Sequence, residues 1–301
     1  MIKYVKRNEL DIEKYDACIE NSLQSRVYGF SWYLDIVADH WDALVLDDYE
    51  AVMPIPWRRK MGISYVYPPF WLLELGLFSL SENVNTKLFF DTLFKHFKFI
   101  ESKLNTNLSK LESSFVIDKQ MQVLDLQKDL DSLFEHYRKD RKKDVKKAVK
   151  AGLVSKWNEV PENLIHLFKS NVGKRTPFIL AKDYTVLLQL MQTCIAKGVG
   201  ELLSIYNEEK RLVAAGFFLN HKDTVTILVS ATDFDCRKNG ENTFLIHKAI
   251  EKYQKDYNVF NFGGSSMPSI AAYFNSFGAS TLDYQQIKYN NLPFWLKIFK
   301  T

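Results

Sequence analysis

The most informative part of the sequence is SATDFDCRKNGEN, residues 230–242. It follows an apolar run and precedes a helical pattern, so a strand ends, a short polar loop turns, and a helix begins. Arg237, Gly240 and Asn242 form an R-x-x-G-x-N pattern at the start of that helix. Gly240 permits close approach of the backbone, and the first helical turn leaves N–H groups that favour an anion. With the charges of Arg237 and Lys238, the loop predicts a diphosphate-binding site. The alternative is a plain polar loop in which Asn242 caps the helix.

Outward from this loop, two blocks of the chain share one predicted order of elements: a helix, a pair of strands, a third strand and a second helix. The second block has a helix at 183–196, strands at 201–206, 211–219 and 224–232, and a helix at 241–256. The first block has a helix at 31–38, strands at 41–46, 51–57 and 63–67, and a helix at 86–101. In the longer helices apolar residues recur at i, i+3, i+4 and i+7. The blocks share negligible sequence identity, so the repeat is one of structure.

These blocks predict an α+β fold with two domains, each a mixed, mostly antiparallel sheet flanked by helices. A chain of 301 residues is long for a single core, which favours the same division. We expect the first domain to span residues 1–130 and the second residues 131–301. A basic helix at 131–151, ending at Gly152, is expected to open the second domain.

The positive charge of the chain is concentrated in that basic segment. Residues 138–150 hold eight basic residues against two acidic ones, a local charge of +6 in a chain whose total is only +4. The remainder therefore carries −2. Such a segment could bind tRNA phosphates, the diphosphate of a nucleotide-linked precursor, or an anionic membrane surface. The alternative is a solvated helix face without a partner.

Composition excludes several other classes of protein. An apolar content of 47 % argues against disorder. The richest apolar stretch, 67–80, is interrupted by two prolines and a glutamate, so no membrane span is expected, and the charged N-terminus does not resemble a secretory signal. The cysteines, Cys18, Cys194 and Cys236, are widely spaced, and the six histidines show no metal-ligand spacing. We expect a reduced, cytoplasmic protein without a metal.

The R-x-x-G-x-N loop resembles the pyrophosphate-binding motif of GNAT-superfamily acyltransferases, with Asn242 in place of the usual small last residue. The second half resembles the FemAB-like branch of that superfamily in three further runs: FNFGGS at 260–265, MPSIA at 267–271 and YFNSFGA at 273–279. Asn261 stands where that family usually has aspartate. YVYPPF at 65–70 is similar to a first-domain segment of the family. The likeness covers most of the chain and is most specific over 201–290.

The resemblance implies two tandem GNAT-like domains and an acyl-donor site in the second. In GNAT enzymes a backbone N–H of the splayed fourth strand, here around 229–231 and centred on Ser230, holds the donor carbonyl and stabilises the oxyanion. The acceptor amine attacks directly, so no side-chain nucleophile is needed. A tyrosine often serves as general acid, but Phe274 occupies its place, which makes the neighbouring Tyr273 the candidate. Weaker candidates are Asp233, Tyr284 and Tyr289.

Four further residues are candidates for binding the acceptor. Arg175 matches a position that the family often fills with arginine before a proline. Arg58 ends a first-domain strand beside two further basic residues, and Lys288 lies on the last strand. Asn261 replaces the family aspartate.

The sequence therefore predicts an N-acyltransferase that moves an acyl group from acyl-CoA, with acetyl-CoA as co-substrate, to an amine of a cell-wall, polysaccharide or small-molecule precursor. Two alternatives stay open. One is a Fem-type peptidoglycan aminoacyltransferase that uses aminoacyl-tRNA, which the basic helix and the resemblance favour. The other is a non-catalytic GNAT-like module that binds nucleic acid or an anionic membrane, which Phe274 at the tyrosine position favours.

Overall fold

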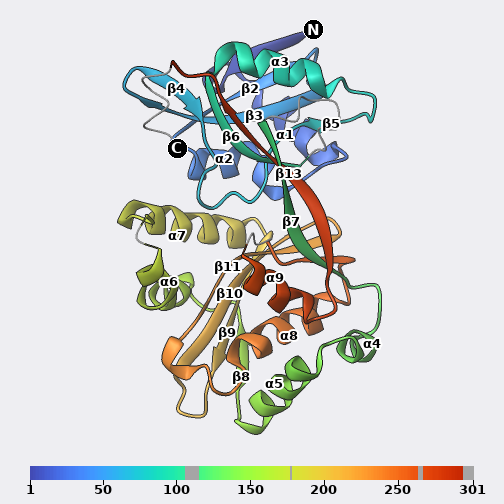
Figure 1. Ribbon diagram of the computed structural model, residues 1–301, viewed down its shortest axis with the longest axis vertical. Helices are drawn as coiled ribbons and strands as arrows, with labels where there is room; N and C mark the ends of the chain where they lie inside the picture. Colours follow the sequence, from blue (N-terminus) through green and yellow to red (C-terminus); the bar gives the residue numbers. More distant parts are fainter. Residues whose placement is uncertain (106–114, 177, 264–266, 294–301) are drawn as a thin grey trace. The chain divides into compact units, whose positions relative to one another are not determined.

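The computed structural model describes residues 1–105, 115–176, 178–263 and 267–293 (Figure 1). Contacts divide the chain into two compact units. Unit 1 consists of Met1–Lys119 and Asp283–Thr301, and unit 2 of Gln120–Leu282. Strand β7 (Val116–Asp125) carries the chain from unit 1 into unit 2, and strand β13 (Ser280–Asn290) carries it back.

This division differs from the sequence-based boundary at residue 130. The prediction placed the whole C-terminal part, to residue 301, in the second domain. In the structure, residues 285–290 of β13 pair antiparallel with β6 (Phe99–Leu104), which belongs to unit 1. A partner strand far away in sequence decides this membership, and the local pattern of β13 does not reveal it.

In its described residues, unit 1 is a mostly antiparallel sheet with three α-helices. Its strand order is β1–β2–β3–β4–β6–β13, in which only the β4–β6 pair is parallel, and the short β5 (Phe78–Ser79) also pairs with β3. The other strands are β1 (Ile2–Lys6), β2 (His40–Leu46), β3 (Ala51–Lys60) and β4 (Ile63–Val66). The helices are α1 (Ile12–Asn21), α2 (Ser31–Val37) and α3 (Thr86–His96).

Unit 2 repeats this plan with more helices. Its strand order is β7–β12–β11–β10–β9–β8, in which only β11–β12 is parallel. The strands are β8 (Val154–Trp157), β9 (Gly200–Tyr206), β10 (Leu212–His221), β11 (Thr224–Thr232) and β12 (Val259–Asn261), together with β7. The α-helices are α4 (Leu130–Glu135), α5 (Lys139–Lys150), α6 (Pro161–Ser170), α7 (Ala181–Ala196), α8 (Glu241–Tyr253) and α9 (Pro268–Asn275).

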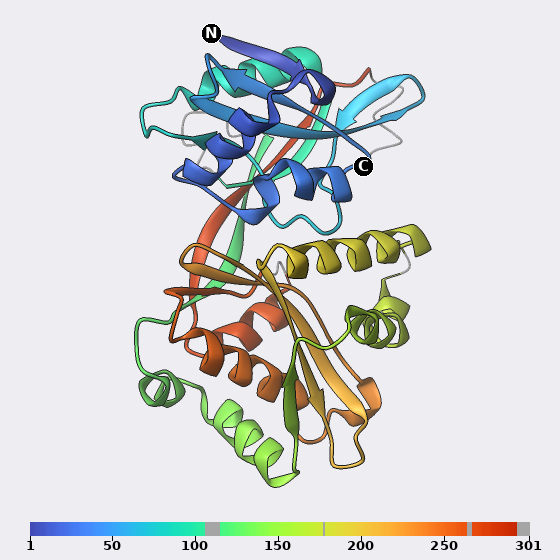
Figure 2. The same ribbon diagram turned by 180° about the vertical axis from the view of Figure 1, so that it is seen from behind.

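The helices of unit 2 cover both faces of its sheet. Helices α6 and α7 lie on one side, and α5, α8 and α9 on the other, as the two opposite views show (Figures 1 and 2). On the α8 side, Ile246, Ala249 and Ile250 pack on the strands in one buried cluster. The order helix, two strands, third strand, helix occurs in both units. The predicted α+β class, with mixed, mostly antiparallel sheets flanked by helices, is confirmed.

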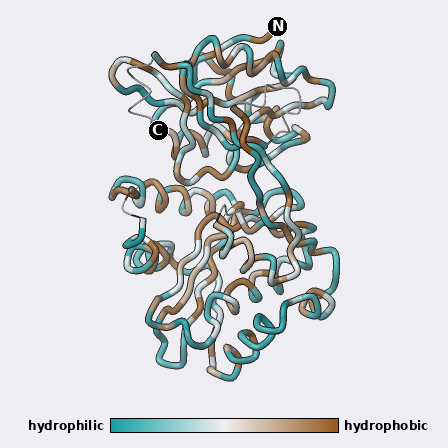
Figure 3. Tube along the Cα trace, viewed as in Figure 1, coloured by the Kyte–Doolittle hydropathy of each residue, from teal (hydrophilic) through white to brown (hydrophobic). Residues whose placement is uncertain are grey.

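The basic segment forms two helices instead of the single predicted helix 131–151. Asp129 caps α4, since its carboxylate accepts from the N–H of Ser132 at 2.9 Å. The chain then turns so that Tyr137 enters the core, and the N–H of Arg138 donates to the carbonyl of Ser276 at 2.8 Å. This tertiary bond breaks the helix. In Figure 3, α5 is almost entirely hydrophilic.

The predicted helix 86–101 is also shorter than expected. Helix α3 ends at His96, and Phe99 begins strand β6. The helical spacing extends to Phe97, which is the C-cap residue and is buried. Beyond it, Phe99 and Ile100 are buried as strand residues that pair with β13, so tertiary pairing overrides the local pattern.

Candidate acyl-donor site

Strands β11 and β12 of unit 2 pair with each other over only a few residues and then diverge. They pair in parallel only from Thr224–Val259 to Thr226–Asn261. Strand β11 continues to Thr232, so within the described part of the chain residues 227–232 have no strand on that side. The register with β10 also shifts at this point, because Phe217 faces Val229 while Phe218 faces Ile227. Strand β11 therefore has one extra residue between Ile227 and Val229. This extra residue forms a β-bulge, which bends the strand and increases its twist.

The open edge of β11 exposes the backbone of Ser230 and Thr232. The N–H of Asp233 donates to the carbonyl of Val213 on β10 at 2.9 Å. Bonding direction alternates along an antiparallel pair, so Ala231 also faces β10, whereas Ser230 and Thr232 direct their backbone groups to the opposite edge. The sequence prediction centred on Ser230 therefore falls on a residue whose N–H points into the gap.

Helix α8 begins beside this edge. Gly240 is its N-cap residue, with φ of 80°, and no side chain described in the structure caps it. The first helical bond runs from Phe244 N–H to the Gly240 carbonyl, which leaves the N–H groups of Glu241 to Thr243 without a helical partner. The carboxylate of Glu241 turns back to accept from the N–H of Asn239. The helix start is therefore a set of donors for an anion.

A pocket of ≈ 550 Å³ joins the strand edge and the helix start. The end of β11, the start of α8 and the first turns of α9 form its walls, and α5 contributes Arg141 and Asp144. Five predicted site residues line it: Ser230, Arg237, Gly240, Asn242 and Tyr273.

Tyr273 directs its hydroxyl to the start of α8. The hydroxyl accepts from the side-chain amide of Asn242 at 3.0 Å and shares a bond with the hydroxyl of Thr243 at 3.3 Å. Burial raises the pKa of Tyr273 above its ordinary value, while the bond from Thr243 and the nearby Arg141 charge oppose the shift. The neighbouring Phe274 stacks on Phe262 with ring centroids 4.8 Å apart. Tyr273 is thus a protonated phenol beside the strand edge.

Solved structures with a similar fold cover nearly the whole chain. FemX superposes with a TM-score of 0.68 at 11 % identity, covering 97 % of this chain and 99 % of that one. The C-terminal domain of a putative lysylphosphatidylglycerol synthetase from Agrobacterium fabrum gives 0.58 at 12 %, covering 93 % and 92 %. A tandem GNAT protein from the clavulanic acid biosynthesis pathway gives 0.56 at 9 %, covering 97 % and 100 %. The chain therefore shares the fold of these FemX, synthetase-domain and tandem GNAT structures. No family model and no curated protein sequence matches it.

Asn242 does not cap helix α8. The alternative prediction, a plain polar loop in which Asn242 caps the helix, is therefore wrong on this point. The side-chain oxygen of Asn242 accepts from the hydroxyl of Thr232 at 3.3 Å, and its amide donates to Tyr273. The side chain therefore ties the end of β11 to α9. A ligand at the helix start would be held by backbone N–H groups.

Arg237 and Arg175 flank one ring. Their guanidinium carbons lie 3.7 Å and 4.2 Å from the ring centroid of Phe234. Neither forms an ion pair with a residue that the structure describes, and partial desolvation, together with the Arg175 charge, lowers the pKa of the largely exposed Arg237. Arg237 lines the pocket, whereas Arg175 and Lys238 do not. Lys238 contributes a backbone carbonyl that accepts from the ammonium of Lys147.

The remaining predicted acceptor residues lie outside this pocket. Asn261 forms a local turn, since its side-chain oxygen accepts from the N–H of Gly263 at 2.9 Å. Arg58 and Lys288 belong to unit 1, where Arg58 pairs with Asp39 and Lys288 is exposed opposite Glu101.

The weaker proton-transfer candidates are also engaged elsewhere. Asp233 pairs with Arg211, and Tyr289 of unit 1 packs against Phe94 with ring centroids 4.4 Å apart. Tyr284 likewise belongs to unit 1.

Arg141 is a pocket residue that the sequence analysis treated only as one of eight basic residues. Its guanidinium lies 4.8 Å from the centroid of the Tyr273 ring and donates to the hydroxyl of Thr243 at 2.9 Å. The signal was present in the sequence: Arg141 shares a helix face, at i, i+4 and i+7, with Val145 and Ala148, both buried. A basic residue on the buried face of an otherwise exposed helix is a candidate for a site.

Gly240 gives a first testable prediction. A methyl group there would meet the carbonyl oxygen of Asp144 at 2.7 Å. Gly240→Ala is expected to lower the free energy of unfolding by about 2–4 kcal/mol, from left-handed backbone strain and overpacking together. Urea denaturation measures this. Gly198→Ala is the control, because Gly198 has φ of +70° but open space around it, so only the strain of about 1–2 kcal/mol applies. Equal losses in both variants would contradict the close packing of α5 on this turn.

No helix among the described residues is long and apolar enough to cross a membrane. The same part of the chain holds no cluster of three or more histidine, cysteine, aspartate or glutamate side chains suited to a metal ion.

Proposed function

We propose that this protein is an N-acyltransferase that uses the unit 2 pocket to hold an acyl donor, with acyl-CoA as the leading candidate. The observation that carries the proposal is the parting of β11 from β12 beside the uncapped start of α8. The space beside β11, where β12 no longer pairs with it, fits a narrow, extended acyl carrier. The start of α8 together with Arg237 fits the diphosphate of such a carrier.

Apart from the two substrates and solvent, transfer would need only groups that this pocket holds. The acceptor is a neutral amine, whose nitrogen attacks the thioester carbonyl carbon and forms a C–N bond while the Ser230 N–H donates to the carbonyl oxygen. The C–S bond then breaks, its electron pair goes to sulfur, and the thiolate takes the proton of Tyr273. The new amide nitrogen loses a proton to solvent, and solvent reprotonates the phenol. The acceptor amine would belong to a cell-wall, polysaccharide or small-molecule precursor.

The second candidate donor is aminoacyl-tRNA, which one observation on α5 favours. Lys139, Lys143, Lys146 and Lys150 are all exposed and follow one another at helical spacing along one face. None of them forms an ion pair with a described residue. The stripe is about 16 Å long, enough to meet several phosphates of a nucleic acid.

Calorimetry distinguishes the donors. Acetyl-CoA is expected to bind the full chain at micromolar to millimolar concentration, and an uncharged tRNA is expected to bind only weakly and to be released by salt. Absence of heat with millimolar acetyl-CoA, combined with binding of aminoacylated tRNA, would reverse the order. If neither donor bound, and only salt-sensitive binding to nucleic acid or anionic vesicles remained, the chain would be a non-catalytic module.

A further inference from the structure

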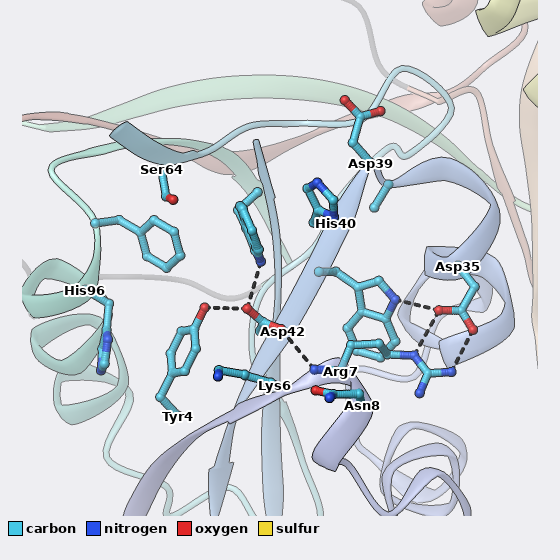
Figure 4. Close-up of a pocket in the computed structure, with 14 residues that line it drawn as sticks. Tyr4, Lys6, Arg7, Asn8, Asp35, Asp39, His40, Asp42, Ser64 and His96 are labelled. Atoms are coloured by element: carbon cyan, nitrogen blue, oxygen red, sulfur yellow. Dashed lines mark hydrogen bonds and ion pairs between the residues drawn. The ribbon is translucent and has the colours of Figure 1, made fainter. Parts of the chain in front are cut away.

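Unit 1 holds a pocket of its own, of ≈ 630 Å³, for which the acyl-transfer proposal gives no role. It lies on one face of β1, β2 and β3. Lys6 pairs in register with Asp42, and His40 with Trp57, so these four side chains project to the same side. In Figure 4, Asp42 and Lys6 lie beside Tyr4, and His96 of α3 lies on the other side of the Tyr4 ring.

Asp42 forms the floor of this pocket. It is 7 % exposed, and its carboxylate accepts three bonds, all from neutral groups: the Tyr4 hydroxyl at 2.6 Å, the Trp57 indole N–H at 2.7 Å and the Arg7 backbone N–H at 2.9 Å. A carboxylate has room for about four such bonds. No ion pair joins Asp42 to any described residue, which is unusual for a buried carboxylate.

The other carboxylates of the lining are already neutralised. Asp35 forms a two-pronged ion pair with Arg7 at 2.8 and 2.9 Å, and Asp39 pairs with Arg58. Lys6 is the counterpart of Asp42: its ammonium is exposed, lines the same pocket and has no ion pair among the described residues. Among the described residues of the lining, Asp42 and Lys6 are thus a carboxylate and an ammonium group without an ion-pair partner, and they do not pair with each other.

Aromatic rings form the walls between these charges. Tyr4 stacks on His96 with ring centroids 4.4 Å apart, and His40 stacks on Trp57 at 4.6 Å. Burial and the bond to Asp42 raise the pKa of Tyr4 well above its ordinary value, so its hydroxyl remains a donor. Asn8 and Ser64 add neutral polar groups at the rim. Aromatic walls attract a cationic group of a ligand, and they also accommodate an apolar group of it.

We infer that this pocket binds a free α-amino acid, whose ammonium donates to Asp42 and whose carboxylate accepts from Lys6. A simple cation would satisfy Asp42 but would be repelled by Lys6, and a simple anion would face the opposite conflict. A small zwitterion satisfies both groups, and the rings cover its side chain. The site belongs to unit 1 and stands independently of the donor pocket.

Asp42 also holds the sheet together, because its three bonds link β1, the turn after it and β3. Asp42→Asn would therefore weaken folding as well as binding. The test uses Lys6→Met instead, since Lys6 is exposed. Lys3→Met is the matched control: Lys3 is exposed on the same strand, and its odd spacing from Lys6 places it on the other face.

The experiment screens the full chain against the twenty common α-amino acids by thermal denaturation and measures the best one by calorimetry. At least one is expected to raise Tm at millimolar concentration. Its N-acetyl derivative, which lacks the ammonium, and its amide, which lacks the carboxylate, are each expected to bind about tenfold more weakly or worse. Lys6→Met should show the same loss for the free amino acid, and Lys3→Met none.

Three results would overturn the inference. They are no change in Tm with any amino acid, undiminished binding of the N-acetyl derivative, or full affinity in Lys6→Met. None of these touches the acyl-donor proposal, because acetyl-CoA binding is measured separately on the same preparation.

Discussion

Tyr273→Phe is expected to lower kcat for acyl transfer about 100-fold or more, with the KM for the acyl donor changed less than about threefold. The hydroxyl lies in the pocket, where it bonds to Asn242 and Thr243, and the ring packs in place whether or not the hydroxyl is present. Removing the oxygen takes away the proton donor for the departing thiolate without removing a contact to the carrier. A burst or steady-state assay of free thiol release measures both constants.

Two variants control for this result. Ser230→Ala should keep kcat within about threefold, because the proposed contribution of Ser230 is its backbone N–H, which alanine retains. Phe274→Leu changes the neighbouring aromatic residue, which also lines the pocket, without touching a hydroxyl. Full activity in Tyr273→Phe, or a large loss in Ser230→Ala, would contradict the assigned roles.

The raised pKa of Tyr273 adds a dependence on pH. Because burial lifts the pKa of the phenol above 10.0, the group stays protonated throughout the neutral and mildly alkaline range. We expect no decline of kcat between pH 7 and about pH 9.5 from loss of this proton. A fall of kcat with an apparent pKa near 8 that disappears in Tyr273→Phe would contradict the unionised phenol.

Arg237→Ala is expected to weaken acyl-donor binding about 10- to 100-fold, with a smaller effect on kcat at saturating donor. Arg237 lines the pocket beside the start of α8 and has no carboxylate partner among the described residues, so its charge is available to a diphosphate. Calorimetry with acetyl-CoA measures the change. The effect should shrink as salt rises, because the guanidinium is exposed.

Lys238→Ala is the matched control, since it removes a neighbouring cation that does not line the pocket. We expect a change of less than about threefold there. Equal losses in both variants would indicate a diffuse attraction of charge instead of a defined contact, and no loss in Arg237→Ala would remove the arginine from the donor site.

The sequence predicted the elements around the site well because their signals are local. The end of β11, the polar loop and the start of α8 were readable from residues 230–242, and Gly240 indeed adopts the left-handed conformation that glycine favours. The position of Tyr273 was harder. Because Tyr273 precedes Phe274 by one residue, its side chain was expected to point away from the place that the family tyrosine takes. In the structure, helix α9 directs Tyr273 to the start of α8 and Phe274 to Phe262.

The features that could not be predicted from the sequence depend on contacts between distant segments. Pairing of β13 with β6 assigns the chain end to unit 1, and the bond from Arg138 to Ser276 splits the basic segment into two helices. The unit 1 pocket was missed for the same reason. Lys6, Asp42 and Trp57 lie far apart in the sequence, and only the register of β1, β2 and β3 sets them side by side.

Hydrogen exchange of the backbone amides, with and without saturating acetyl-CoA, tests whether the pocket of unit 2 holds the acyl donor. The open edge of β11 and the start of α8 should both gain protection, at Ser230 and Thr232 and at Glu241 to Thr243, because a bound carrier would accept from those N–H groups. Protection confined to other segments, with these amides exchanging as fast as in the free protein, would contradict the donor site proposed for unit 2.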